Sequence, residues 1–136
     1  MANFKLVDRD TSYILPPSVD EWLPEDHLAR FVVEIVDQLD VSALERSYTG
    51  SGSKAYHPRM MTALLFYSYA TGTFSSRRIE RASYESVPTR YVAGNQHPDH
   101  DTICSFRRRF LEPLEALFTQ ILLVAAEMGL TELADV

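Results

Sequence analysis

The stretch His97-Pro-Asp-His-Asp-Thr-Ile-Cys-Ser-Phe-Arg-Arg-Arg-Phe110 determines how the centre of this chain folds. Asp101 is suited to cap a helix, because its carboxylate can accept hydrogen bonds from the free backbone N–H groups of the first turn. Ile103, Phe106 and Phe110 then recur at i, i+3 and i+7, the spacing of one apolar stripe on a helix. The stretch therefore predicts a helix over residues 97–110 that buries this stripe.

Three consecutive arginines end this predicted helix. At 3.6 residues per turn, Arg108 and Arg109 lie on the far side of the apolar stripe, whereas Arg107 lies inside it. We expect Arg107 to pair with an acid such as Asp99 or Glu80. A guanidinium donates hydrogen bonds in pairs to phosphate or guanine, so the outward face of this helix predicts DNA contacts. The candidates on that face are Thr102, Ser105, Arg108 and Arg109.

Helical periodicity extends over most of the chain. Further helices are predicted at 24–39, 41–46, 57–72, 75–86, 88–94 and 113–129, with Thr49–Ser53 as a glycine- and serine-rich loop. The apolar stripe of the last helix consists of Leu114, Leu117, Phe118, Ile121, Leu122, Ala125 and Met128. Strand-like alternation is missing, so the fold class is predicted to be all-α, a compact bundle of about six helices with a helix-turn-helix-like central region.

A second basic helix is predicted to begin after a turn at Gly72. Arg77 and Arg81 are one helical turn apart, Tyr84 follows on the same face, and Arg78 adds a further charge. A helix, a glycine turn and a second helix match the helix-turn-helix outline, and phosphate groups would relieve the repulsion between these arginines. The alternative is a solvated basic face.

The charges are unevenly distributed along a chain whose net charge is −6. Residues 1–53 carry a net charge of −6, residues 54–109 carry +5, and residues 110–136 carry −5. Only the central segment therefore has a balance suited to a polyanion. The single cysteine, Cys104, excludes an internal disulfide and fits a reducing cytoplasm, and no apolar run is long enough to span a membrane.

The sequence predicts no metal or cofactor site. His97, Asp99, His100 and Asp101 are close in sequence, but their spacing matches no common zinc pattern. Gly50-Ser-Gly52-Ser lacks the lysine and the following helix of a phosphate-binding loop. Neither a serine nor a cysteine has a suitable histidine partner in its sequence context.

Four motifs follow one another along the chain: His57-Pro58-Arg59 with the apolar helix after it, Ser76-Arg77-Arg78-Ile79-Glu80, Asp-x-x-Thr-Ile-x-x-Phe-Arg-Arg-Arg-Phe after His97-Pro98, and Gly129-Leu130. In this order and spacing they resemble the N-terminal domain of bacterial insertion-sequence transposases of the RNase-H-like Asp-Asp-Glu class. The resemblance covers residues 57–130 well and 15–56 more loosely. It implies DNA binding, with transposon terminal inverted repeats as the partner.

In that family, the first catalytic aspartate lies on a strand that begins shortly after a helix of this kind. This chain ends at Val136 without an Asp-Gly-Thr-like strand, so we expect it to lack the catalytic carboxylate triad and to have no enzymatic activity. We expect an extended lead-in at 1–23, the helical DNA-binding-like domain at 24–130, and a tail at 131–136 that leads towards a catalytic domain.

The predicted function is therefore a non-catalytic, cytoplasmic and nucleoid-associated DNA-binding domain. Its predicted contacts are Arg77, Arg78, Arg81, Thr102, Ser105, Arg108 and Arg109. One alternative is an interaction module that uses acidic ends and an apolar helix to bind a catalytic domain or a second copy. Another is a small helix-turn-helix transcriptional regulator, which would be a dimer. A truncated reading frame without a function of its own is also compatible with the sequence.

Overall fold

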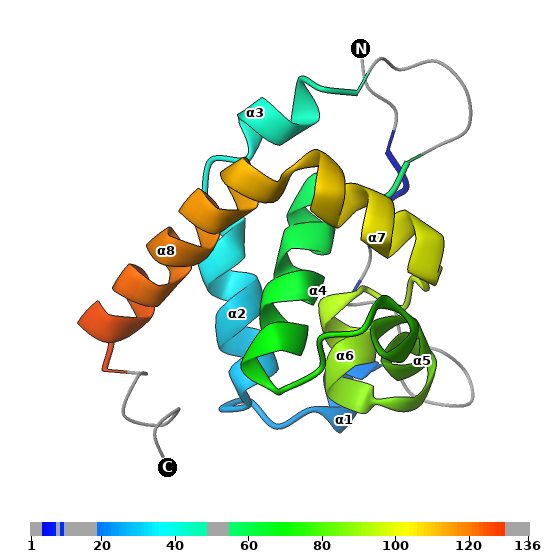
Figure 1. Cartoon of the computed structure of the whole chain (residues 1–136). Helices are drawn as coiled ribbons and strands as arrows, with labels where there is room; N and C mark the ends of the chain where they lie inside the picture. The colour runs from blue at the N-terminus through cyan, green and yellow to red at the C-terminus, as the bar shows by residue number, and fades with distance from the viewer. Residues whose placement is uncertain (1–3, 8, 10–18, 49–54, 130–136) are drawn as a thin grey trace.

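Helices account for nearly all of the described structure, a computed structural model that covers residues 4–7, 9, 19–48 and 55–129. They are α1 (Val19–Trp22), α2 (Leu28–Asp37), α3 (Ser42–Glu45), α4 (Pro58–Ala70), α5 (Ser76–Glu85), α6 (Val87–Val92), α7 (His100–Arg109) and α8 (Leu111–Glu127). They form one bundle without strands among these residues (Figure 1). The predicted all-α class is confirmed. The helix α1 lies in the segment expected to be extended, and the predicted 49–53 loop and 131–136 tail lie outside the described residues.

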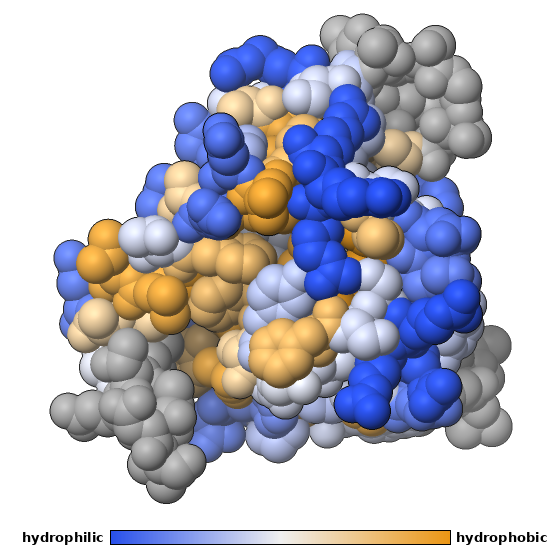
Figure 2. All heavy atoms as spheres, viewed as in Figure 1, coloured by the Kyte–Doolittle hydropathy of each residue, from blue (hydrophilic) through white to orange (hydrophobic). Residues whose placement is uncertain are grey.

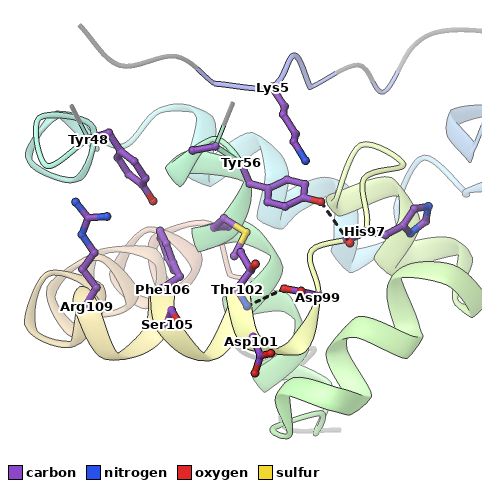
Figure 3. Close-up of a pocket in the computed structure, with 12 residues that line it drawn as sticks. Lys5, Tyr48, Tyr56, His97, Asp99, Asp101, Thr102, Ser105, Phe106 and Arg109 are labelled. Atoms are coloured by element: carbon purple, nitrogen blue, oxygen red, sulfur yellow. Dashed lines mark hydrogen bonds between the residues drawn. The ribbon is translucent and has the colours of Figure 1, made fainter. Parts of the chain in front are cut away.

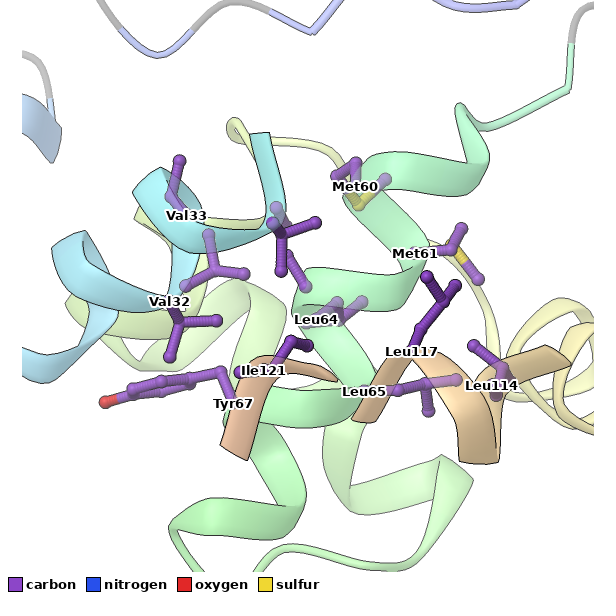
Figure 4. Close-up of a cluster of buried hydrophobic side chains, with 14 of the residues drawn as sticks. Val32, Val33, Met60, Met61, Leu64, Leu65, Tyr67, Leu114, Leu117 and Ile121 are labelled. Carbon is purple, nitrogen blue, oxygen red and sulfur yellow. The ribbon is translucent and has the colours of Figure 1, made fainter. Parts of the chain in front are cut away.

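The core forms around α4, which runs through the middle of the bundle (Figures 1 and 4). Leu64 and Leu65 of α4 are fully buried between the apolar sides of α2 and α8. The stripe of α2 supplies Val32 and Val36, and α8 supplies Ile121. The helix α4 itself carries apolar residues on nearly every side, so it is stable with other helices packed around it, as its composition predicts.

The helix boundaries follow from local chemistry. The imidazoles of His27 and His57 accept hydrogen bonds from the first turns of α2 and α4, and Ser75 caps α5. Gly72 and Gly129 have φ values of 84° and 77°, a left-handed conformation that ends α4 and α8 and that glycine adopts without a steric penalty. The predicted turn at Gly72 is confirmed, whereas α2 begins at Leu28 and not at residue 24 as predicted.

The helix α8 differs from its predicted pattern. Leu114, Leu117 and Ile121 are buried as expected, but Leu122 and Met128 are 54% and 53% exposed. The predicted stripe is wider than the surface that α2 and α7 present to α8, so its outer members face solvent. Apolar side chains consequently cover α8 on the face shown in Figure 2.

Three helices of the central segment form a unit beside α4. The helix α5 packs on both α6 and α7, and α6 also packs on α2 and α4 (Figure 1). The turn after α6 contains two left-handed residues, Gly94 and Asn95, with φ values of 60° and 61°. This turn redirects the chain so that α7 lies across α5.

The N-terminal residues that the structure describes lie along the segment before α4. Phe4 forms an isolated parallel bridge with Ala55, and Lys5 donates its backbone N–H to the Ala55 carbonyl at 2.7 Å. This contact places Lys5 near α7. Within the described ranges, every helix is too short or too polar to cross a lipid bilayer.

Candidate nucleic-acid interface

The N-cap of α7 is Asp99 and not Asp101 as predicted, and the helix begins at His100. The Asp99 carboxylate accepts a hydrogen bond from the Thr102 N–H at 2.8 Å. Hydrogen bonding by the Thr102 side chain, and then by its backbone, lowers the pKa of Asp99 below its ordinary value. Asp101 is instead exposed in the first turn. Ile103, Phe106 and Phe110 are buried, so the predicted stripe is confirmed.

Arg107 has partners other than the predicted acids. Its guanidinium donates hydrogen bonds to the Tyr69 hydroxyl at 2.6 Å, to the Phe74 carbonyl at 2.9 Å, and to the Ser76 hydroxyl. These three groups belong to the end of α4, the turn after it and the start of α5. Arg107 therefore joins three helices and is engaged in the fold.

Two further contacts fix α5 against α7 and the loop before it. His100 donates both its backbone N–H and its Nδ1–H to one Glu80 oxygen, at 2.8 and 2.9 Å. This side-chain hydrogen bond lowers the pKa of Glu80. The His97 ring stacks on the Tyr84 ring, with centroids 3.9 Å apart and planes 6° from parallel, and its Nδ1 lies 3.2 Å from the Ser83 hydroxyl. The two basic helices thus form one interlocked unit.

The arginines of α5 are free to bind a ligand. Arg77, Arg78 and Arg81 are exposed, and none of their guanidinium groups has a hydrogen bond or ion pair with any residue that the structure describes. Arg77 follows Ser76 and Arg81 follows Glu80, the residues that contact α7. A step of one residue turns about 100° around a helix, so both arginines point outward from that contact.

A shallow hollow lies beside two of these arginines. Its volume is about 350 Å³. Its lining consists of Thr73, Arg78, Arg81, Ala82, Glu85 and Ser86. Two guanidiniums and two hydroxyl groups around one hollow suit a phosphate group, and Glu85 partly offsets their charge.

Arg108 and Arg109 differ in their polar contacts. Arg108 is exposed and, like the α5 arginines, has no polar partner in the described ranges. Arg109 donates a hydrogen bond to the Ser47 carbonyl, and its guanidinium lies 4.6 Å from the centre of the Tyr48 ring. Arg109 therefore fastens α7 to the segment after α3, and its side chain remains exposed, as predicted.

Arg77, Arg78, Arg81 and Arg108 are exposed on two helices that pack on each other. Figure 2 shows strongly hydrophilic side chains over α7 and α5, and also over α3. We call Arg77, Arg78, Arg81 and Arg108 the arginine surface.

The other two predicted contacts, Thr102 and Ser105, lie elsewhere on α7. Together with Arg109 they line a cavity of about 590 Å³ on the side of α7 that faces Tyr48 and Tyr56 (Figure 3). The cavity is also lined by Lys5, Ala55, Met61, His97, Asp99, Asp101 and Phe106. Sequence reasoning missed it because its walls come from segments far apart in the chain, and no local pattern marks such a meeting.

Several other arginines serve the fold by binding backbone carbonyl groups. Arg9 donates to the Tyr91 and Val92 carbonyls at the end of α6, at 3.0 and 2.8 Å. Arg59 binds two carbonyls at the end of α2, and Arg30 binds the Asp20 carboxylate at 2.7 Å. Part of the positive charge counted in the sequence is thus used inside the protein.

The comparisons with known proteins identify the family. The family model described as Transposase domain (DUF772) matches residues 17–109, more than half of the chain. The chain belongs to this transposase-domain family. The match includes α5, α6 and all of α7. No curated protein and no solved structure matches the chain.

The predicted absence of a metal site concerned His97, Asp99, His100 and Asp101. His97 binds Ser83 and Tyr84, and His100 binds Glu80. Across the part of the chain that the structure describes, no three His, Cys, Asp or Glu side chains are grouped as metal ligands would be.

Proposed function

We propose that this transposase domain binds double-stranded DNA at transposon ends through the arginine surface. The observation that carries the proposal is the exposure of Arg77, Arg78, Arg81 and Arg108 on two interlocked helices, without an acidic partner in the described structure. Exposed guanidiniums on a rigid support neutralise phosphates and release counterions, which is the main source of affinity for DNA.

The arrangement of α5, α6 and α7 supports this proposal. Two short helices, a tight turn and a third helix laid across the first resemble the helix-turn-helix outline. In such an arrangement the N-terminal half of the last helix contacts base edges, and the other helices contact the backbone. On this proposal, the α5 arginines and Arg108, which lies near the C-terminal end of α7, bind phosphates of the backbone.

The chemistry of strand transfer belongs, on the same proposal, to an RNase-H-like Asp-Asp-Glu domain, as the resemblance to insertion-sequence transposases implies. The present domain would supply recognition of terminal inverted repeats. Its site of action would be bacterial nucleoid DNA.

A binding assay tests the proposal. Fluorescence polarisation is measured with a labelled duplex of the element's terminal inverted repeat and with a scrambled duplex of equal length. We expect tighter binding of the repeat. Arg81→Ala should weaken binding several-fold, whereas Arg46→Ala should leave it unchanged, because Arg46 is also exposed but lies after α3, away from the arginine surface. Equal effects of the two variants would contradict the proposed site.

A second candidate function is a protein-interaction module, favoured by α8. This helix exposes Leu111, Leu122 and Leu123, of which Leu123 is 61% exposed, and the residue after it, Met128, is exposed too. Its only charged residues are glutamates. Charge complementarity therefore indicates a partner whose apolar patch is surrounded by Lys or Arg. If Leu122→Ser with Leu123→Ser abolishes binding of a synthetic amphipathic Leu/Lys peptide, and the unaltered chain binds no duplex at low salt, the interaction function is favoured over DNA binding.

A further inference from the structure

We propose that the cavity between α7 and the two tyrosines Tyr48 and Tyr56 binds one unpaired nucleotide. The inference rests on the proposed DNA binding but concerns a different side of α7. The arginine surface would hold the duplex, and the cavity would take a base that is not paired. A single-stranded end or a free mononucleotide could supply this ligand.

The size and the floor of the cavity fit a nucleotide. Its volume of about 590 Å³ lies within the range of about 300–1,000 Å³ that is usual for small-molecule sites. Phe106 and Met61 form an apolar floor, and Tyr48 and Tyr56 stand opposite α7 (Figure 3). Aromatic side chains around a hollow are the usual platform for unpaired bases, because every base has a π face.

Two cations are held at the cavity by these aromatic rings. The Lys5 ammonium lies 3.9 Å from the centre of the Tyr56 ring, and the Arg109 guanidinium lies 4.6 Å from that of Tyr48. Arg109 uses one amino group for the Ser47 carbonyl, and its fork has further N–H donors. Both cations are therefore positioned to attract a phosphate attached to a stacked base.

Polar groups on α7 complete the site. The Thr102 and Ser105 side chains lie one turn apart on the cavity side of the helix, where their hydroxyls can bond to a sugar or a base (Figure 3). Asp99 lies at the end of the cavity away from Arg109. Its carboxylate caps α7, but it can accept further hydrogen bonds, such as those from a base amino group. The site should therefore favour adenine, cytosine and guanine over thymine, which lacks that amino group.

The cavity is within reach of a strand that leaves the arginine surface. Arg108 and Arg109 are adjacent exposed residues, and Arg109 lines the cavity. Arg108 and the cavity are therefore separated by no more than the width of one helix, about 10 Å. A nucleotide unpaired at a duplex end could bend over α7 while the duplex stays on α5.

The experiment compares a blunt duplex, the same duplex with a short single-stranded adenine extension, and the same extension without its bases. We expect the adenine extension to bind about tenfold more tightly than the blunt duplex, as base stacking on aromatic residues supplies. The duplex with the abasic extension should bind no more tightly than the blunt duplex. A thymine extension should gain less than adenine.

Two variants locate the effect. Ser105→Trp fills the cavity from an exposed position and should remove the gain while leaving blunt-duplex affinity unchanged. Arg77→Ala with Arg81→Ala should weaken blunt and extended duplexes by the same factor, leaving their ratio intact. Thr102→Phe provides a second filling variant, and circular dichroism melting identifies any variant that fails to fold.

The outcomes separate the two proposals. If the unaltered chain binds no blunt duplex but does bind a single-stranded adenine oligonucleotide, the duplex function is contradicted. If Ser105→Trp then abolishes binding of that oligonucleotide, the cavity proposal is supported. Binding of dAMP itself, lost in Ser105→Trp, identifies a free mononucleotide as a source of the ligand. The inference is overturned if the extension gives no gain, or if the gain persists in both filling variants or with the abasic strand.

Discussion

The helices α5 and α7 each carry three arginines, but they use them differently. On α5, all three guanidiniums are exposed and have no polar partner in the described structure. On α7, Arg107 binds three groups of neighbouring helices and Arg109 binds the Ser47 carbonyl, so Arg108 alone resembles the α5 arginines. The comparison teaches that a run of arginines in a sequence does not define a binding surface. The partners of each guanidinium decide whether its charge holds the fold or faces a ligand.

The largest expected difference between the two helices is in stability. Arg107→Met should lower the free energy of unfolding by about 2 kcal/mol, because hydrogen bonds to a charged group are lost and the Phe74 carbonyl and Ser76 hydroxyl lose their partner. Urea unfolding followed by circular dichroism measures this change. The control is Arg108→Met, which should stay within about 0.5 kcal/mol of the parent. Equal losses in the two variants would erase the distinction within α7.

A smaller effect is expected from the pair that joins the two helices. The His100 hydrogen bond lowers the pKa of Glu80 in the folded chain, so the pair stabilises the fold above the unfolded pKa of about 4.3. This contribution is lost as pH falls through the lowered pKa of the folded state. Glu80→Gln should therefore flatten the decline in melting temperature between about pH 5 and pH 3. An unchanged acid profile would show that the pair does not help to hold α5 on α7.

The smallest effect concerns His97. Burial lowers the pKa of His97 below its ordinary value, so the folded chain binds this proton less readily than the unfolded chain. Stability should consequently decline as pH falls below about 6.5. His97→Phe keeps a ring against Tyr84 and should reduce this decline in melting temperature between pH 7.5 and 5.5. Part of the decline in melting temperature should persist in this variant, because burial also lowers the pKa of His57.

The sequence was informative where local chemistry decides the structure. The buried stripe of Ile103, Phe106 and Phe110 and the Ser75 cap follow from spacing and from side chains next to their own backbone. Asp99 and Asp101 are both capable caps, and the choice between them depends on where α7 meets α5. The Glu80 carboxylate, 20 residues away, binds the first residue of α7 and fixes its start at His100.

The candidate site was less predictable, because contacts between residues far apart in the sequence decide which arginines are engaged. The outward position of Arg77 and Arg81 follows from helical spacing. The carbonyl that engages Arg109 lies 62 residues away in sequence, and the partners of Arg107 lie 31 to 38 residues away. Such contacts depend on how the helices pack, so helical position alone could not show that Arg109 is engaged, and it gave Arg107 the wrong partners.

The central claim is that the α5 arginines, and not the engaged arginine Arg109 of α7, neutralise DNA phosphates. The most direct measurement is the slope of log affinity against log salt concentration for a blunt terminal-repeat duplex. Each lost phosphate contact should reduce that slope by about 0.9, so the triple variant Arg77→Ala, Arg78→Ala, Arg81→Ala should lose about 2.7 from its magnitude. Arg109→Ala should leave the slope of the parent chain unchanged. The account would be contradicted if the triple variant kept the salt slope of the parent chain. It would also be contradicted if Arg109→Ala reduced that slope by about 0.9, as much as each α5 arginine.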